Sequence, residues 1–303
     1  MNGVANAVRR ATGEEWLSSD DQFRAFYENL SNCEPATDVM VAGRDGLIVG
    51  YGRASWYEDL EGQRLYEPVA FAHPDQPPEL LGVVLQAMEA RCREIAATHP
   101  AGPKQFQTDA SDSAVAQVAL LLGRDYEPAR YSFLMVRPNL DDVPDAALPE
   151  GLEIREVEPE HLRTIFDAEV EAFRDHWGMG LPTEEDYQQF LTDPVGGRYE
   201  RWRVAWDGGQ VAGAVRGFIN YEENRQYGRK RGWVENISVR RPWRRRGLAR
   251  ALIAASITVL REQGMTEGAL GVDTENPTGA LRLYESCGFV AVKREATYRK
   301  PLA

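Results

Sequence analysis

The sequence predicts an α/β (α+β) fold made of two tandem domains, each with a mixed, mostly antiparallel sheet flanked by helices. Segments rich in β-branched residues alternate with segments of helical periodicity along the chain of 303 residues. The order of these segments occurs twice, which indicates an internal repeat. Residues 138–150 separate the two copies and hold three prolines among aspartates, as is typical of a linker. We therefore expect domains at residues 1–137 and 151–303.

The first copy follows a poorly patterned lead-in at residues 1–15. Residues 16–30 carry aromatic and leucine side chains at helical spacing, and Asp20 could cap this helix. Downstream, short apolar runs between glycine turns predict strands, and a strongly periodic run predicts a long helix. The expected elements are strands at 38–42, 47–56 and 64–72, a helix at 80–97, a strand at 104–109, a helix at 111–122 and a strand at 131–136.

The second copy repeats this layout. A hairpin is expected around the turn 207–209, and Thr183 with Asp186 forms a capping box that starts a helix. The expected elements are a strand at 152–157, helices at 160–173 and 183–191, strands at 202–206, 211–220 and 232–239, a helix at 248–263 and a strand at 269–273.

The organising stretch of the second copy is a strand, a basic turn and a helix. Pro242 cannot continue a sheet, so the strand ends before it. If the helix starts near Arg246–Gly247, its first N–H groups have no partner and carry the positive end of the helix dipole. Gly247 allows a close approach to the backbone, and Ala249 is small for the same reason. The turn therefore predicts a site for a phosphate or pyrophosphate, and a solvated basic turn is the alternative.

The sequence Arg244-x-x-Gly247-x-Ala249 resembles the pyrophosphate loop of the GNAT superfamily of N-acetyltransferases. Downstream, residues 272–289 resemble the strand, the Asn-x-x-Ala helix and the Leu-Tyr-x-x-x-Gly-Phe ending of that superfamily. The two motifs stand in the expected order and at the expected separation. The resemblance covers roughly the C-terminal half of the chain.

The resemblance implies acetyl-CoA as co-substrate and no metal. Family members hold the pantetheine arm in a splay between two central strands, here 233–239 and 269–273. Asn276 matches a family position that contacts the pantetheine or orients the loop, although it could instead cap a helix before Pro277. The residues assigned to acetyl-CoA are Ile237, Ser238 and Val239 at the pantetheine, Arg244, Arg245, Arg246, Gly247, Leu248 and Ala249 at the pyrophosphate, and Asn276.

Direct attack of an amine on the thioester needs a base for the ammonium proton and an acid for the leaving thiolate. The resemblance makes Tyr284 the candidate acid, since a phenol with a pKa of about 10 suits a thiolate. A packed core tyrosine is the alternative. Glu235 is the candidate base, because strict alternation places it on the same side as Ile237 and Val239. An ion-paired or solvent-facing residue is the alternative, and the competing carboxylates are Asp273 and, at greater distance, Glu222 and Glu223.

In this superfamily the loop between the first two helices covers the acceptor, and here that loop is 173–180. His176 and Trp177 lie in it beside charged residues and glycines, an unusual composition for a plain connection. We expect both to contact the acceptor, with His176 binding it or moving a proton. A packed loop histidine is the alternative.

The first copy differs where the phosphate site is expected. Residues 73–80 contain prolines and acids in place of the arginine cluster and glycine. Proline removes N–H donors, and acids repel anions. Asp112 stands where the second copy has Asn276, and no Leu-Tyr pair precedes Gly123. We expect this copy to be degenerate, with a structural role or a role as a wall of the acceptor pocket, rather than a second working site.

Composition narrows the class of protein. The net charge of -12 argues against a general nucleic-acid binder. No apolar run approaches the ~20 residues that span a bilayer, and the N-terminus lacks a signal peptide. The three cysteines have no metal-ligand spacing. We expect a cytoplasmic monomer or homodimer without membrane or nucleic-acid partners.

Together these features predict an acetyl-CoA-dependent N-acetyltransferase that acts on a primary amine of a small molecule. The alternatives are a non-catalytic acyl-CoA-binding sensor or interaction protein, and a protein N-acetyltransferase. Retention of Glu235, Asn276 and Tyr284 beside the basic turn favours the enzyme over the sensor.

Overall fold

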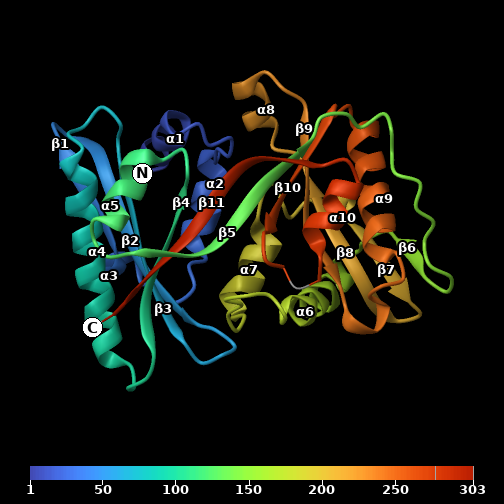
Figure 1. Ribbon diagram of the computed structural model, residues 1–303, viewed down its shortest axis with the longest axis horizontal. Helices are drawn as coiled ribbons and strands as arrows, with labels where there is room; N and C mark the ends of the chain where they lie inside the picture. Colours follow the sequence, from blue (N-terminus) through green and yellow to red (C-terminus); the bar gives the residue numbers. More distant parts are fainter. Residues whose placement is uncertain (277, 303) are drawn as a thin grey trace. The chain divides into compact units, whose positions relative to one another are not determined.

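The computed structural model describes residues 1–276 and 278–302, and their contacts form two compact units (Figure 1). Unit 1 contains residues 1–131 and 183–186 and the chain from Arg294 onward. Unit 2 contains residues 132–182 and 187–293. The expected linker at 138–150 thus falls in unit 2, and the assignment of domains to residues 1–137 and 151–303 stays a prediction.

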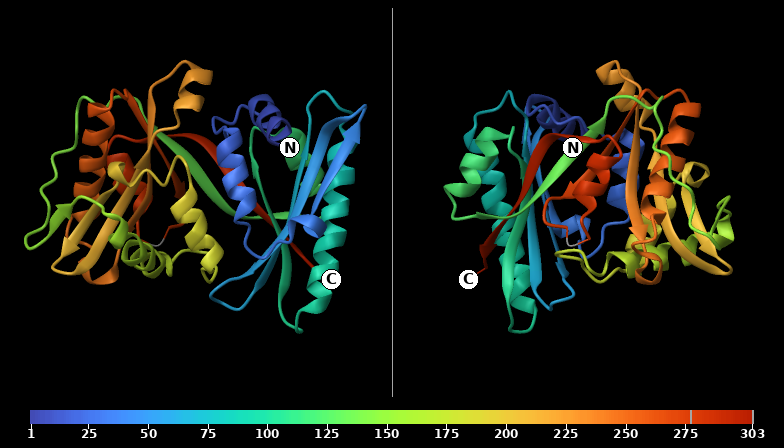
Figure 2. Two further views of the ribbon diagram at one scale, coloured as in Figure 1. Left: turned by 180° about the vertical axis from the view of Figure 1, so that it is seen from behind. Right: turned by 45° about the vertical axis from the view of Figure 1, so that its right-hand side comes forward.

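The sheet of unit 1 contains, in this order, β1, β2, β3, β4 and the part of β11 from Arg294 onward; β3 and β4 pair in parallel, and the other described neighbours pair antiparallel. Helices α4 and α5 cover one face over a core that includes Tyr66 and Phe106. Helices α1 and α2 lie on the other face, where Val4 and Ala5 pack against Tyr51 (Figure 2). The bounds are α1 (Asn2–Ala11), α2 (Asp20–Glu28), α3 (Pro35–Asp38), β1 (Val39–Arg44), β2 (Leu47–Glu58), β3 (Arg64–Ala72), α4 (Glu79–Thr98), β4 (Lys104–Ser111), α5 (Val115–Leu122) and β11 (Val290–Pro301).

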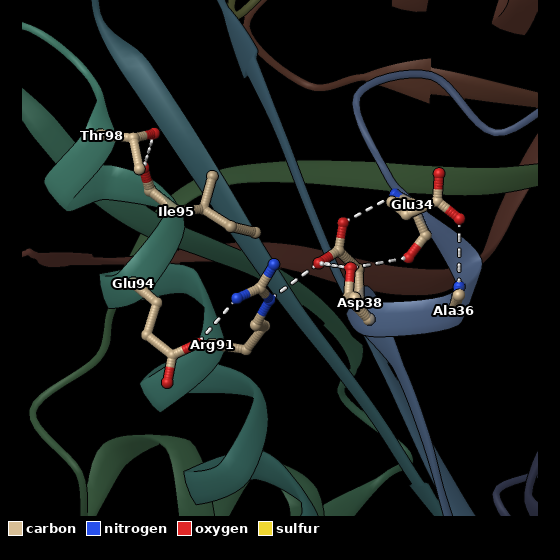
Figure 3. A network of polar contacts seen from close by, with 8 residues as sticks. Glu34, Ala36, Asp38, Arg91, Glu94, Ile95 and Thr98 are labelled. Atoms are coloured by element: carbon tan, nitrogen blue, oxygen red, sulfur yellow. Dashed lines mark hydrogen bonds and ion pairs between the residues drawn. The ribbon is translucent and has the colours of Figure 1, made fainter.

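A buried carboxylate fixes the short helix α3 to the long helix α4. Asp38 accepts a hydrogen bond from Arg91 Nε at 2.8 Å and another from the backbone N–H of Glu34 at 2.6 Å. Arg91 also pairs with Glu94 at 2.7 Å, one turn along α4 (Figure 3). Asp38 is only 5% exposed, and a buried carboxylate needs charged or hydrogen-bonding partners. Arg91 and the N–H of Glu34 are these partners.

The sheet of unit 2 contains, in this order, the part of β5 from Ser132 onward, β10, β9, β8, β7 and β6; β9 and β10 pair in parallel, and the other described neighbours pair antiparallel. Helices α9 and α10 cover the larger core, which includes Val234 and Leu270, and α6 and α7 cover a second one around Trp202 (Figure 1). The bounds are β5 (Glu127–Arg137), β6 (Glu153–Arg155), α6 (Leu162–Phe173), α7 (Glu184–Thr192), β7 (Arg203–Asp207), β8 (Gln210–Phe218), α8 (Tyr221–Tyr227), β9 (Arg231–Val239), α9 (Leu248–Glu262), β10 (Glu267–Asp273) and α10 (Ala280–Ser286), with short 3-10 turns at Pro159–His161, Tyr199–Arg201 and Arg241–Trp243.

The predicted fold class is confirmed, and the differences are local. Helix α1 forms where a poorly patterned lead-in was expected. Its two buried residues, Val4 and Ala5, are small and apolar and pack it against the sheet. The Asp20 cap is wrong: Ser19 is the N-cap and forms a capping box with Gln22. The Thr183 and Asp186 box is confirmed, with Asp186 N–H donating to Thr183 Oγ1 at 3.2 Å.

Candidate active site

The central feature of unit 2 is the early end of the pairing between β9 and β10. The two strands pair in parallel from Arg231 with Glu267 to Trp233 with Ala269. Strand β9 then continues to Val239 and β10 to Asp273 without further pairing to each other. Backbone N–H and C=O groups along this splay are therefore available to a ligand that lies between the strands.

A bulge in β9 lies beside the splay. Ala214 of β8 lies opposite Ser238, and Arg216 lies opposite Glu235, so β9 has one residue more than β8 between these pairs. Asn236 adopts the left-handed conformation with φ 50°, which accommodates the extra residue.

The bulge changes which side chains of β9 share a face, so the alternation expected from the sequence is wrong here. Because the bulge shifts the alternation by one residue, Glu235 does not share a face with Ile237 and Val239. Ile237 and Val239 instead pack, half-buried, against the core under α9, which contains Val234. The candidate base thus lies near the splay for a different reason from the one expected.

Glu235 spans the splay with its side chain. Its Oε1 accepts a hydrogen bond from the backbone N–H of Gly271 on β10 at 2.8 Å. Removal from bulk water raises the pKa of Glu235 to about 7, although the N–H groups of Gly271 and Asn236 and the charge of Arg216 favour the ionised form. A carboxylate that titrates near neutral pH is suited to accept a proton.

The expected phosphate loop has the geometry of an anion site. Gly247 is the N-cap of α9 and has φ 86°, a conformation that favours glycine. Helix α9 begins at Leu248, just after the expected start, and no acidic residue lies in its first turn. Arg245, also left-handed with φ 61°, is exposed together with Arg246. The N–H groups of the first turn and these two side chains are thus placed for an anion.

Arg244 has a different environment from its two neighbours. Its Nε donates to the carbonyl of Val239 at 2.9 Å, and its Nη2 donates to the carbonyl of Ala172 at 2.9 Å. Its Nη1 pairs with Asp175 Oδ2 at 2.6 Å, and Asp175 also pairs with Arg241. The two guanidinium groups hold the pKa of Asp175 well below its usual range. Arg244 therefore joins the expected acceptor loop to the phosphate loop.

Tyr284 and Asn276 lie after β10. Tyr284 is buried in α10, and burial with the nearby charge of Glu235 raises its pKa, so the phenol keeps its proton at neutral pH. Asn276 does not cap a helix: its Oδ1 accepts from the N–H and hydroxyl of Thr278, while α10 begins at Ala280 after Gly279. Pro277 lies outside the described residues.

The loop after α6 brings His176 near the end of β10. His176 packs edge-on against Phe173, with 4.7 Å between ring centroids. Burial lowers the pKa of His176, while the carboxylate of Asp273 acts in the opposite direction. Trp177 is half-buried in the same loop. His176 thus stays neutral at neutral pH and is within electrostatic reach of the competing carboxylate Asp273.

The more distant carboxylates, Glu222 and Glu223, are paired with arginines. Glu223 is buried in α8 and pairs with Arg229, and Glu222 pairs with Arg225 at 3.4 Å. Neither glutamate is among the groups that interact with Glu235.

Sequence reasoning missed three charged residues of this region: Glu169, Asp175 and Arg216. Glu169 lies on the buried face of α6, one turn after Ile165, and Arg216 interrupts the apolar strand β8. For Glu169 and Arg216 a charge at an apolar position of the element was the available signal, because such charges are buried in pairs.

Metal ligands and membrane-spanning helices are two further features that would point to a function. Within residues 1–276 and 278–302, no group of three or more His, Cys, Asp or Glu side chains is placed to share a metal ion. In the same part of the chain, every helix is too short or too polar to traverse a bilayer.

Comparison with known proteins gives concordant matches. The model of the family described as Acetyltransferase (GNAT) family matches residues 162–289. The chain is 31% identical over 239 residues to a mycothiol acetyltransferase of Thermobispora bispora. The aligned region covers 76% of this chain and 79% of that protein. It is 29% identical over 275 residues to a mycothiol acetyltransferase of Salinispora arenicola, and this alignment covers 88% of this chain and 82% of that protein. The tandem layout by itself also resembles mycothiol synthase.

Solved structures share the fold over the whole chain. A GCN5-related N-acetyltransferase from Sphaerobacter thermophilus superposes with a TM-score of 0.69 at 24% identity and covers 99% of this chain and 91% of that one. A tandem GNAT protein from the clavulanic acid biosynthesis pathway superposes with a TM-score of 0.65 at 16% identity and covers 100% and 95%. The tandem architecture inferred from the repeat is therefore found in a solved structure.

Proposed function

Since the chain belongs to the GNAT acetyltransferase family, we propose that it transfers the acetyl group of acetyl-CoA to a primary amine of a small molecule by direct attack. The observation that carries the proposal is the position of Glu235. Its carboxylate lies across the splay between β9 and β10, and its pKa is raised to about 7. It is therefore basic enough to take a proton from an ammonium group and still ionised in part at neutral pH.

The residues of unit 2 fit acetyl-CoA, which supplies the activated thioester. Gly247 with φ 86° opens the first turn of α9, and Arg245 and Arg246 are exposed beside it, so this loop would hold the pyrophosphate. The unpaired edge of β9 at Ile237, Ser238 and Val239 would hold the pantetheine arm through backbone hydrogen bonds, and Asn276, which follows β10, would contact the arm or orient the loop.

Two side chains would move protons during the transfer. Glu235 accepts a proton from the amine, directly or through water. Tyr284, which burial keeps neutral, donates a proton to the sulfur that leaves. Because the charge of Glu235 is itself one cause of the raised pKa of Tyr284, protonation of Glu235 makes Tyr284 a better donor.

The loop after α6 would receive the acceptor, with His176 and Trp177 in contact with it. The carboxylate of Asp273, at the end of the splay, interacts electrostatically with His176. The names of the curated relatives point to the amine that becomes mycothiol on acetylation, and we propose this class of acceptor first. We also propose that the protein acts in the cytoplasm, in keeping with free thiols at Cys33, Cys92 and Cys287.

Calorimetric titration with acetyl-CoA, followed by an acetylation assay on des-acetyl mycothiol and a panel of simple amines, tests the proposal. We expect one bound acetyl-CoA per chain and N-acetylation of at least one small amine. Binding without turnover on any amine would support the sensor, and turnover on peptide N-termini alone would support a protein acetyltransferase. Two bound molecules would show that unit 1 also binds the cofactor.

A further inference from the structure

A buried ion pair lies under the α6 face of the unit 2 sheet. Glu169 of α6 is only 5% exposed, and its Oε2 lies 3.0 Å from Nε of Arg216 on β8. Its other oxygen, Oε1, is buried and has no hydrogen-bond partner in the described part of the chain. Burial raises the pKa of Glu169 to about 7, against the attraction of Arg216. Burial of such a pair has a large desolvation cost in free energy, and its replacement by apolar residues would often stabilise the fold.

The same arginine lies beside the candidate base. Arg216 on β8 is directly opposite Glu235 on β9, which places their Cβ atoms about 5 Å apart on one face. The guanidinium lies over the rings of Phe190 and Trp202, with its Cζ 4.8 and 5.2 Å from the ring centroids. These aromatic contacts restrict the guanidinium, whose Nε pairs with Glu169 and whose charge acts on Glu235.

The charged, titratable and hydrogen-bonding groups that act on Glu235 come from four elements besides its own. Arg216 lies on β8, and Tyr284 lies on α10, where its phenol stays neutral. Strand β10 contributes the N–H of Gly271, while its carboxylate Asp273 interacts with His176 of the loop after α6. Glu169 of α6 acts on Glu235 through the cation that both carboxylates face. Arg216 is thus the only full positive charge among these described groups.

We propose that Glu169 and Arg216 are positioning residues for the proton transfer: Glu169 engages Arg216, so that Glu235 remains a proton acceptor instead of the sole ion-pair partner of this arginine. The proposal rests on the proposed function, because it takes Glu235 as the group that accepts the amine proton. In the step itself a proton passes from the amine nitrogen to a carboxylate oxygen of Glu235. Glu169 and Arg216 touch neither substrate.

The substitution Glu169→Gln keeps the shape of the side chain and removes its charge. Arg216 then has only Glu235 as a carboxylate partner, which favours the ionised form of Glu235 and weakens it as a base. We expect the acid limb of the kcat/KM profile to move to lower pH by about one unit, with a several-fold fall in kcat at high pH. The substitution Arg216→Met removes the cation, so the acid limb should move in the opposite direction, to higher pH.

The test compares the pH profiles of these two variants with wild type and with Asp167→Asn. Asp167 lies on the same helix and pairs with the exposed Arg163 at 3.1 Å, so its loss should leave the profile in place. Shifts of opposite sign in the two buried variants support the proposal. Loss of rate without a shift, or shifts of the same sign, would overturn it and leave the pair a structural role.

A direct titration separates this proposal from the proposed function. The carboxyl carbon of Glu235, followed by NMR in the free protein, reports its pKa without any turnover. A lower pKa in Glu169→Gln than in wild type supports the coupling even if the acceptor is not the expected amine. An unchanged pKa of Glu235 in both variants would refute the coupling even in an active enzyme. Circular dichroism and Tm identify a variant that fails to fold. In that case Glu169→Asp replaces it: the shorter side chain keeps the charge but draws it away from Arg216, so the shift should have the same direction and be smaller.

Discussion

The two units place carboxylates at matching points of their sheets. In unit 1 the parallel pairing of β3 with β4 ends at Tyr66 with Phe106, just as that of β9 with β10 ends at Trp233 with Ala269. In unit 1 Glu67 and Asp109 lie one and three residues beyond this end, and in unit 2 Glu235 and Asp273 lie two and four residues beyond it. Removal from water raises the pKa of both Glu67 and Asp109. A desolvated acid beside an early end of strand pairing is thus common to the two copies.

The surroundings of these acids differ. Glu67 accepts a hydrogen bond from Ser55 Oγ at 3.1 Å, on the neighbouring strand, and Asp109 accepts one from Thr297 at 2.6 Å. Glu235 instead takes a backbone N–H across its splay. Strand β3 pairs with β2 without a register shift, and Pro68 follows Glu67 where β9 has the bulge at Asn236. Unit 1 therefore offers no left-handed bulge beside its acid.

The turns that follow the strands differ still more. Helix α4 begins at Glu79 after Pro78, with an acid in its first turn. Helix α9 begins after left-handed Gly247 with no acid in its first turn. A negative side chain at a helix N-terminus occupies the place that a phosphate would take. The proposed phosphate loop and the bulge, and not the carboxylate alone, therefore distinguish the proposed catalytic copy.

The largest effect should come from Gly247→Asp. An aspartate at φ 86° is strained, and its charge repels a pyrophosphate, so we expect acetyl-CoA affinity to fall by at least about 100-fold in calorimetry. Gly62→Asp in unit 1 is the matched control, because Gly62 has φ 79° and equally open surroundings. Unchanged affinity of the Gly247 variant would remove the phosphate loop from unit 2.

Next in size is the contrast between Glu235→Gln and Glu67→Gln. Wild-type activity should rise with pH through about 7 as Glu235 loses its proton, since only the carboxylate accepts one. Glu235→Gln should lower kcat by about 100-fold and flatten this acid limb, whereas Glu67→Gln should change neither. The pH–rate profiles of the two variants show whether the acid limb depends on Glu235 and not on Glu67. An intact acid limb in Glu235→Gln would move the base to Asp273 or to a water chain.

A smaller effect is expected for Tyr284→Phe, which removes the proposed proton donor and keeps the ring. We expect kcat to fall by roughly ten-fold while the Kd of acetyl-CoA stays the same. Tyr298→Phe, at a buried tyrosine of unit 1, provides the control for loss of a buried hydroxyl. Full activity of the Tyr284 variant would leave this residue a purely structural role in the core.

How far the sequence predicts the molecule depends on the range of the interactions. Long periodic helices such as α4 and α9, and the turn at Gly247 that precedes α9, follow from local pattern, which places them within a few residues. The bulge at Asn236 was not predictable from β9 alone, because it is defined by the register with β8. Ion pairs between distant segments, such as Glu169 with Arg216, likewise leave only the weak signal of a charge at an apolar position.

The smallest effect, and the finest distinction between the units, concerns Asp175. Its pairs with Arg241 and Arg244 connect the loop of His176 to the phosphate loop of unit 2. Asp175→Asn should loosen this loop and raise the KM of the acceptor a few-fold, with acetyl-CoA affinity little changed, because the N–H groups of α9 remain in place. Asp112→Asn in unit 1, which breaks an exposed pair with Arg294 at 2.6 Å, should alter neither constant. Steady-state kinetics with both substrates varied measures the two effects separately. A weaker acetyl-CoA site in Asp175→Asn, with the acceptor KM unchanged, would show that Arg244 needs this carboxylate to hold the phosphate loop and not the acceptor loop.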